Sequence, residues 1–115
     1  MIQIYHNPRC SKSRECLISF EGIDEEVEII KYLDNPPTVK ELKSIVKKLK
    51  IKPIDLVRKN EKEWTPFKDA ILSDSEIIKL MSKYPILIER PIVISGDKAV
   101  LARPLGKALA LLKSI

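Results

Sequence analysis

The 115-residue sequence predicts one α/β domain, residues 1–115, built on a mixed β-sheet. Its first thirty residues alternate apolar strand, helix and strand, which is typical of two parallel strands joined by a crossover. Near its end, two strand-like segments flank Gly96-Asp97, a two-residue hairpin signal. Between these ends, apolar residues recur at helical spacing. The predicted order is therefore β-α-β, a helical insertion, then β-β-α.

The first three elements have clear local signals. An apolar segment at residues 2–5 predicts a strand, which Asn7-Pro8 ends. Residues 11–20 are typical of a helix, with Gly22 as its C-terminal stop. Residues 27–30 predict the second strand.

The helical insertion is expected over about residues 36–85. Thr38 and Glu41 have the spacing of a capping box, in which a hydroxyl and a carboxylate satisfy the first backbone amides. Ser73 and Glu76 repeat that spacing. We therefore expect one helix to begin at each pair.

The predicted hairpin brings two arginines together. If Gly96-Asp97 is a two-residue turn, Arg90 and Arg103 lie opposite each other on neighbouring strands. Like charges repel there, but an oxyanion between them would relieve the repulsion, since guanidinium groups bind oxyanions in a bidentate manner. The alternative is that both arginines are simply exposed at strand ends. A helix beginning at Pro104 is expected to complete the domain.

Composition limits the classes of partner. The formal net charge is +5, and 32% of residues are charged, but basic residues are mixed with acidic ones. No basic run alternates with aromatic residues, which disfavours nucleic-acid binding. No stretch of about 18 apolar residues exists, so no membrane span is expected. Two cysteines and no recognisable signal peptide favour a reducing cytoplasm.

Cys10 is the strongest candidate for a reactive group. It lies between the first strand and the first helix, where backbone amides and the helix dipole favour a thiolate. Arg9, Lys12 and Arg14 surround it in the sequence. The alternative is an unreactive cysteine that caps the helix.

A disulfide between Cys10 and Cys16 is not expected. Six helical residues rise about 9 Å, whereas the Cα atoms of a disulfide are at most roughly 7 Å apart. Position 13, where a C-x-x-C motif would place its second thiol, is serine. We therefore expect Cys16 to be a small core residue, and the chemistry to depend on one thiol and an external reductant.

Several motifs together resemble the glutaredoxin-linked arsenate reductase family, in its C-S-K-S-R branch. They are IYHNPRCSKSRECL, YLDNPP, LVRKNE, PILIERPIV and ARP. They follow one another over nearly the whole chain. The resemblance implies a thioredoxin-like fold with a helical insertion between the second and third strands, which agrees with the order above.

The resemblance also implies the site. Cys10 matches the catalytic cysteine of the family. The family's three oxyanion-binding arginines match Arg58, Arg90 and Arg103. No metal and no bound cofactor are expected.

Other residues near the cysteine are expected to support it. His6 would tune the thiolate or shuttle a proton, or else only hydrogen-bond the loop. Pro91 resembles the cis-proline that faces the cysteine in thioredoxin-like folds, so we predict that it is cis. Ser13 and Arg14 lie close to the cysteine in the sequence, and Arg14 adds positive charge.

The resemblance implies reduction of arsenate to arsenite. The Cys10 thiolate would attack arsenic, glutathione would attack the adduct as reductant, and glutaredoxin would resolve the product. Expected partners are thus arsenate or a similar oxyanion, glutathione and glutaredoxin, with no nucleic acid and no membrane. A cytoplasmic monomer is expected.

Two other functions stay open. The first is a glutathione-dependent thiol-disulfide oxidoreductase that uses Cys10 on protein substrates. The second is a redox-responsive transcription regulator that binds RNA polymerase and shares this fold. Those regulators resemble C-x-x-C near their start, and Ser13 departs from that pattern.

Overall fold

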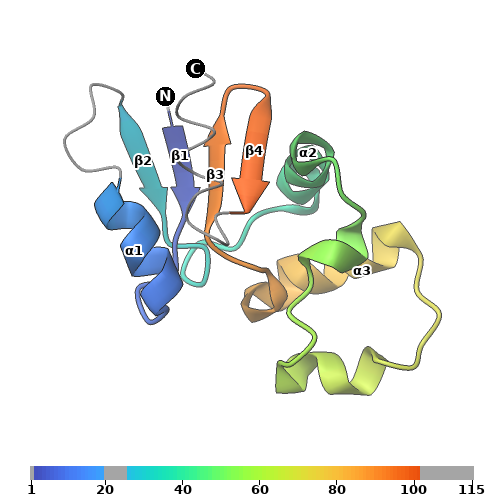
Figure 1. Ribbon diagram of the computed structural model, residues 1–115. Helices are drawn as coiled ribbons and strands as arrows, with labels where there is room; N and C mark the ends of the chain where they lie inside the picture. Colours follow the sequence, from blue (N-terminus) through green and yellow to red (C-terminus); the bar gives the residue numbers. More distant parts are fainter. Residues whose placement is uncertain (1, 20–25, 102–115) are drawn as a thin grey trace. The chain divides into compact units, whose positions relative to one another are not determined.

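The computed structural model describes residues 2–19 and 26–101 (Figure 1). The chain divides into two compact units, which are described separately. The first combines residues 1–35 with residues 90–115, and the second is Pro36–Glu89. The expectation of one domain over the whole chain stays a prediction.

The first unit contains a four-stranded sheet in the order β2-β1-β3-β4. Its elements are β1 (Ile2–Tyr5), α1 (Ser11–Ser19), β2 (Val27–Ile30), β3 (Ile92–Ser95) and β4 (Lys98–Leu101). β1 is parallel to β2 and antiparallel to β3, which is itself antiparallel to β4. The predicted mixed sheet is confirmed, and Figure 1 shows β1 between β2 and β3.

The hairpin of β3 and β4 has the predicted register. Ile92 pairs with Leu101, and Ser95 pairs with Lys98, so two residues form the turn. Gly96 has φ of +61°, in the left-handed region that favours glycine. Gly96 therefore favours this two-residue turn, because glycine tolerates the backbone conformation that the turn requires.

Some predicted features lie outside the described residues. They are the helix stop at Gly22, Arg103, and the helix expected from Pro104. Within residues 2–19 and 26–101, no helix is both long and apolar enough to cross a membrane.

The core of the first unit joins the sheet to α1. Ile2 and Ile4 are alternate residues of β1 and therefore point to the same face of the sheet. They form a buried cluster with Val93 of β3 and Cys16 of α1. Cys16 has no exposed surface, so its predicted place in the core is confirmed.

The second unit is the helical insertion. It contains α2 (Val39–Leu49) and α3 (Asp74–Lys83), together with three short 3₁₀ helices. These are η1 (Pro53–Leu56), η2 (Lys62–Phe67) and η3 (Pro85–Leu87). α2 packs against α3, and the Ser82 hydroxyl donates a hydrogen bond to the Pro37 carbonyl over 2.8 Å.

Both predicted capping boxes are present. The Thr38 hydroxyl accepts a hydrogen bond from the Glu41 amide, and the Glu41 carboxylate accepts one from the Thr38 amide. Ser73 and Glu76 do the same at the start of α3. These bonds satisfy amides that have no partner within the helix, which explains why α2 and α3 begin where they do.

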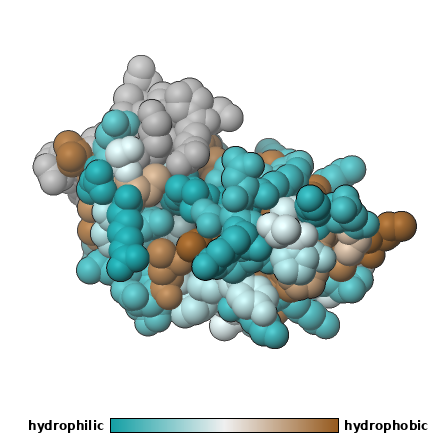
Figure 2. Space-filling model, turned by 90° about the horizontal axis from the view of Figure 1, so that it is seen from below, coloured by the Kyte–Doolittle hydropathy of each residue, from teal (hydrophilic) through white to brown (hydrophobic). Residues whose placement is uncertain are grey.

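Large hydrophobic side chains that stay exposed are scattered among the described residues. They are Ile18, Ile29 and Ile71, from α1, β2 and the loop before α3. On the face drawn in Figure 2, the surface is mostly hydrophilic and hydrophobic atoms show in separate small groups. Exposed apolar residues of this kind are normal on a folded protein.

Replacing Ile4 should cost far more stability than replacing its neighbour Ile29. The two residues pair across β1 and β2, but Ile4 is fully buried whereas Ile29 is 47% exposed. Ile4→Ala should lower the free energy of unfolding by about 2–5 kcal/mol, because it leaves a cavity. Ile29→Ala should lower it by about 1 kcal/mol or less. Urea denaturation measures both, and equal losses would contradict this core.

Candidate active site

Cys10 occupies the N-cap position of α1. Its carbonyl accepts a hydrogen bond from the Arg14 amide over 3.0 Å, and α1 itself begins at Ser11. Its amide donates to the Asn7 carbonyl, also over 3.0 Å. The helix N-terminus carries positive partial charge, so this position favours an anion or a thiolate. Cys10 is 9% exposed.

Hydrogen bonds hold the loop before Cys10 in place. The Asn7 carboxamide oxygen accepts from the Arg9 amide over 3.0 Å, which closes a turn. The Asn7 amide donates to the Ser13 hydroxyl over 2.9 Å. The Arg14 guanidinium donates to the Pro8 carbonyl over 2.9 Å. These hydrogen bonds therefore fix the conformation of the loop that leads to Cys10.

His6 is buried beside Ser13. Its Nδ1 lies 2.7 Å from the Ser13 hydroxyl oxygen, and both tautomers of the neutral ring can form this bond. Burial lowers the pKa of His6 from its usual 6.5, and the positive charges of Lys31 and, less strongly, Arg14 lower it further. The contact with Ser13 acts in the opposite direction. The imidazole is therefore mainly neutral at pH 7, and it does hydrogen-bond the loop.

The two cysteines of the first unit have different surroundings. Ser13 stands at the second position of a C-x-x-C motif, has no exposed surface, and is hydrogen-bonded to His6 and Asn7. Burial raises the pKa of the Cys16 thiol to about 11, so this group stays protonated at neutral pH. Cys10 and Cys16 are both thiols, not halves of a disulfide.

Three loops meet at the edge of the sheet where Cys10 lies. Tyr5, the last residue of β1, pairs with Ile30 at the end of β2 and with Ile92 at the start of β3. The loop of residues 6–10, called the Cys10 loop, follows Tyr5. Lys31 follows Ile30, and the segment Arg90-Pro91 precedes Ile92. Neighbouring strands are about 4.8 Å apart, so these loops are close to one another.

The segment before β3 has two of the predicted features. The Arg90-Pro91 peptide bond is cis, as predicted. Arg90 is buried, with 7% of its surface exposed. A guanidinium group at this edge adds positive charge on the β3 side of the Cys10 loop.

Arg58 belongs to the second unit. Its backbone is held where residues 57 and 88 form an isolated β-bridge, with the Arg58 amide donating to the Leu87 carbonyl over 2.7 Å. Its side chain contacts Glu61 at 2.9 Å and Glu89 at 3.5 Å. The side chains of Arg58 and of both glutamates are between 22% and 29% exposed, so solvent and ions can reach both ion pairs.

Glu61 and Glu89, the ion-pair partners of Arg58, were not among the residues predicted from the sequence. Both lie within motifs already quoted for the arginines, LVRKNE and PILIERPIV. Their presence in the same motifs as the arginines was the sequence signal that could have identified these ion-pair partners. Arg103 lies outside the described residues, so the predicted convergence of Arg58, Arg90 and Arg103 on one oxyanion stays a prediction, as does the catalytic role of Cys10.

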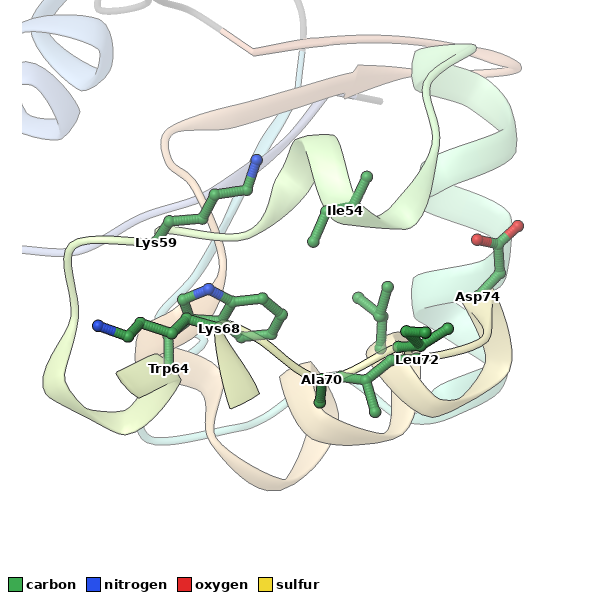
Figure 3. Close-up of a pocket in the computed structure, with 9 residues that line it drawn as sticks. Ile54, Lys59, Trp64, Lys68, Ala70, Leu72 and Asp74 are labelled. Atoms are coloured by element: carbon green, nitrogen blue, oxygen red, sulfur yellow. The ribbon is translucent and has the colours of Figure 1, made fainter. Parts of the chain in front are cut away.

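Each unit has a pocket. In the first unit, a pocket of about 330 Å³ lies beside the Cys10 loop. In the second, a pocket of about 540 Å³ has Trp64, Ile54 and Leu72 on its walls and Lys59 and Asp74 at its rim (Figure 3). No cysteine, histidine or arginine lines the second pocket. Among the residues described, no group of three or more His, Cys, Asp or Glu could hold a metal ion.

The mixed sheet, the cysteine at the start of α1 and the cis-proline before β3 define a thioredoxin-like thiol protein. The chain belongs to the ArsC family, whose family model matches residues 5–111. An arsenate reductase of Haemophilus influenzae is 43% identical over 114 residues, covering 95% of this chain and 97% of the relative. One of Neisseria meningitidis is 37% identical and covers 96% and 97%.

Solved structures agree with this assignment. The arsenate reductase from Vibrio cholerae superimposes with a TM-score of 0.88 at 38% sequence identity, covering 95% of each chain. The predicted thioredoxin-like fold and the family resemblance are therefore confirmed.

Alkylation should distinguish the two cysteines. Iodoacetamide at pH 7 should modify Cys10 alone, because Cys16 is fully buried and only roughly 10⁻⁴ of it is thiolate when its pKa is about 11. Mass spectrometry of tryptic peptides identifies the modified residue. Cys16→Ala should still take up one label, and Cys10→Ser none. Labelling of Cys16 in the folded protein at a rate similar to that of Cys10 would refute the assignment.

The protonation of His6 should depend on Lys31. The chain has one histidine, so a single imidazole signal in proton NMR reports its pKa. That pKa should lie below 6.5, and Lys31→Gln should raise it, because Lys31 is the second cause of the lowering. Lys98→Gln is the control and should leave it unchanged, because Lys98 is exposed beside the β3–β4 turn, at the other end of the same sheet.

The same shift has a consequence for stability. Because the unfolded chain binds a proton at His6 near pH 6.5 and the folded chain binds it only at lower pH, the free energy of unfolding should fall as pH drops below 6.5. A His6 pKa above 6.5 would contradict both expectations.

Proposed function

We propose that this protein is an arsenate reductase that uses Cys10 as its nucleophile and glutathione as its reductant. The observation that carries the proposal is the position of Cys10, at the N-cap of α1 and in a hydrogen-bonded loop. Relatives named arsenate reductase match nearly the whole length of this chain, which supports the choice of arsenate as substrate.

The first step forms a bond between sulfur and arsenic. The Cys10 thiolate attacks arsenic in arsenate, one arsenate hydroxyl group takes up a proton and leaves as water, and arsenic stays pentavalent. The N-terminal amides of α1 and the arginines stabilise the negative charge that builds up on the oxyanion.

The second step transfers two electrons. The thiolate of glutathione attacks the Cys10 sulfur and forms a disulfide, while the electron pair of the sulfur–arsenic bond stays on arsenic. Arsenic becomes trivalent and leaves as arsenite, which takes up protons. Glutaredoxin then attacks the mixed disulfide and restores the Cys10 thiol. The family's dependence on an external thiol agrees with Cys10 being the only reactive thiol here.

The arginines would hold the oxyanion. Arg90 precedes β3 at the same edge of the sheet as the Cys10 loop, and Arg58 is held by Glu61 and Glu89. An oxyanion can replace one of these carboxylates, because the ion pairs are partly exposed. Arg103 would complete the set.

The proposed chemistry requires a compartment in which thiols stay reduced. We also propose that it works as a monomer in the cytoplasm, where glutathione keeps thiols reduced. The buried serine at position 13 supports a single-thiol reaction over the dithiol chemistry of a C-x-x-C regulator.

Arsenate turnover with glutathione and glutaredoxin tests the proposed function. Cys10→Ser should lower the rate by at least about 1,000-fold, because oxygen at that position is a far weaker nucleophile at neutral pH. Cys16→Ala is the matched control and should retain most of the activity. Coupling arsenite release to NADPH oxidation through glutathione reductase gives the rate. Unchanged turnover in Cys10→Ser, or none in the unmodified protein, would sink the proposal.

A further inference from the structure

The pocket beside the Cys10 loop lies between two loops of the first unit. Its volume is about 330 Å³, within the roughly 300–1,000 Å³ of typical small-molecule sites. Four consecutive residues, 6–9, form one wall, and the loop after β2 forms the other. The residues of that second wall are Lys31, Leu33 and Asp34.

Both walls are built from ordered backbone. The first is the hydrogen-bonded segment that leads to Cys10. In the second, the amides of Asp34 and Asn35 both donate to the Lys31 carbonyl over 3.0 Å, and Tyr32 is fully buried. A pocket that is already formed binds a ligand without first ordering a loop, which improves affinity.

The charges on the walls suit a particular kind of ligand. Arg9 and Lys31 are exposed cations, and Asp34 is an exposed carboxylate. The charge of Lys31 lowers the pKa of His6, which forms part of the other wall, so Lys31 acts across the pocket. Two cations and one anion complement a molecule that carries two carboxylates and one ammonium group.

The pocket is on the opposite side of the Cys10 loop from Arg90. β1 lies between β2 and β3, so the loop after β2 flanks the Cys10 loop on one side and Arg90-Pro91 flanks it on the other. Cys10 itself does not line the pocket, which begins one residue before it, so two substrates can approach the Cys10 loop from different sides. An oxyanion held by Arg90 leaves the β2 side open to a second reactant.

We infer that the pocket formed by residues 6–9 with Lys31, Leu33 and Asp34 binds the thiol co-substrate, a short peptide thiol with two carboxylates and one ammonium group. Glutathione has this charge pattern. The inference rests on the thiol step of the proposed function and adds the place where that thiol docks.

Docking here supplies the second step of the reaction. The two carboxylates of the peptide pair with Arg9 and Lys31, and its ammonium group pairs with Asp34. The thiolate then attacks the Cys10 sulfur, forms the sulfur–sulfur bond and leaves the electron pair on arsenic. Holding the thiol beside Cys10 raises its effective concentration at the sulfur.

Binding can be measured without any reaction. S-methylglutathione cannot form a disulfide, and His6 is the only histidine of the chain and lines the pocket. Titration should shift the single imidazole signal in a saturable way, and Lys31→Glu should weaken the apparent affinity by roughly fivefold. An imidazole signal that stays unchanged through the titration would overturn the inference.

Disulfide exchange gives the sharper test, since it needs no arsenate. Oxidised glutathione carries the charges that the pocket would recognise, whereas bis(2-hydroxyethyl) disulfide is neutral, and each forms a mixed disulfide with Cys10. The readout is the ratio of the two second-order rates in stopped flow. Lys31→Glu should lower this ratio by roughly fivefold, since it turns an attraction into a repulsion. Added salt should lower the ratio in the unmodified protein.

Lys98→Glu is the matched control. It makes the same change in net charge, is exposed, and lies beside the β3–β4 turn, at the end of the sheet away from the Cys10 loop. It should leave the ratio unchanged. Equal slowing of both disulfides by Lys31→Glu, or equal ratios in the two variants, would overturn the inference that this pocket binds the thiol co-substrate. A discriminating ratio in a protein that does not reduce arsenate would instead refute only the choice of arsenate.

Discussion

Tyr5 pairs with Ile30 on one side and with Ile92 on the other, and the candidate groups of the first unit depend on this double pairing. Because β1 is central, the three loops that leave these paired residues share one edge of the sheet. Cys10 follows β1, the loop with Lys31, Leu33 and Asp34 follows β2, and Arg90 precedes β3. A sheet in another strand order would separate these groups even if each local segment kept its conformation.

Within the first unit, the Ser13 hydroxyl links α1 to the loop that carries Cys10. It is buried and bonds both the His6 ring and the Asn7 amide. A second cysteine at this position would give dithiol chemistry, whereas the serine fixes the loop. His6 is kept mainly neutral by burial and by Lys31, so it adds little positive charge beside Cys10, where the N-terminal amides of α1 favour an anion.

Local sequence signals predicted the elements well, because each depends on neighbouring residues. Thr38 and Ser73 start their helices through bonds to residues three positions later, and Gly96 sets the hairpin turn by its own backbone freedom. The partners of Arg58 and the pocket walls were not predictable in this way. Glu89 reaches Arg58 only through the bridge between residues 57 and 88, and Lys31 meets the Cys10 loop only through the register of β1 with β2. Such contacts depend on tertiary pairing.

We propose that Cys10 and three arginines from distant parts of the sequence hold one oxyanion. A crystal structure of the protein soaked with arsenate tests this claim most directly. We expect an anion next to the Cys10 sulfur at the N-terminus of α1, with guanidinium groups of Arg58, Arg90 and Arg103 at hydrogen-bonding distance. Arginines that point into bulk solvent, or an anion bound elsewhere while the Cys10 sulfur stays unoccupied, would contradict it.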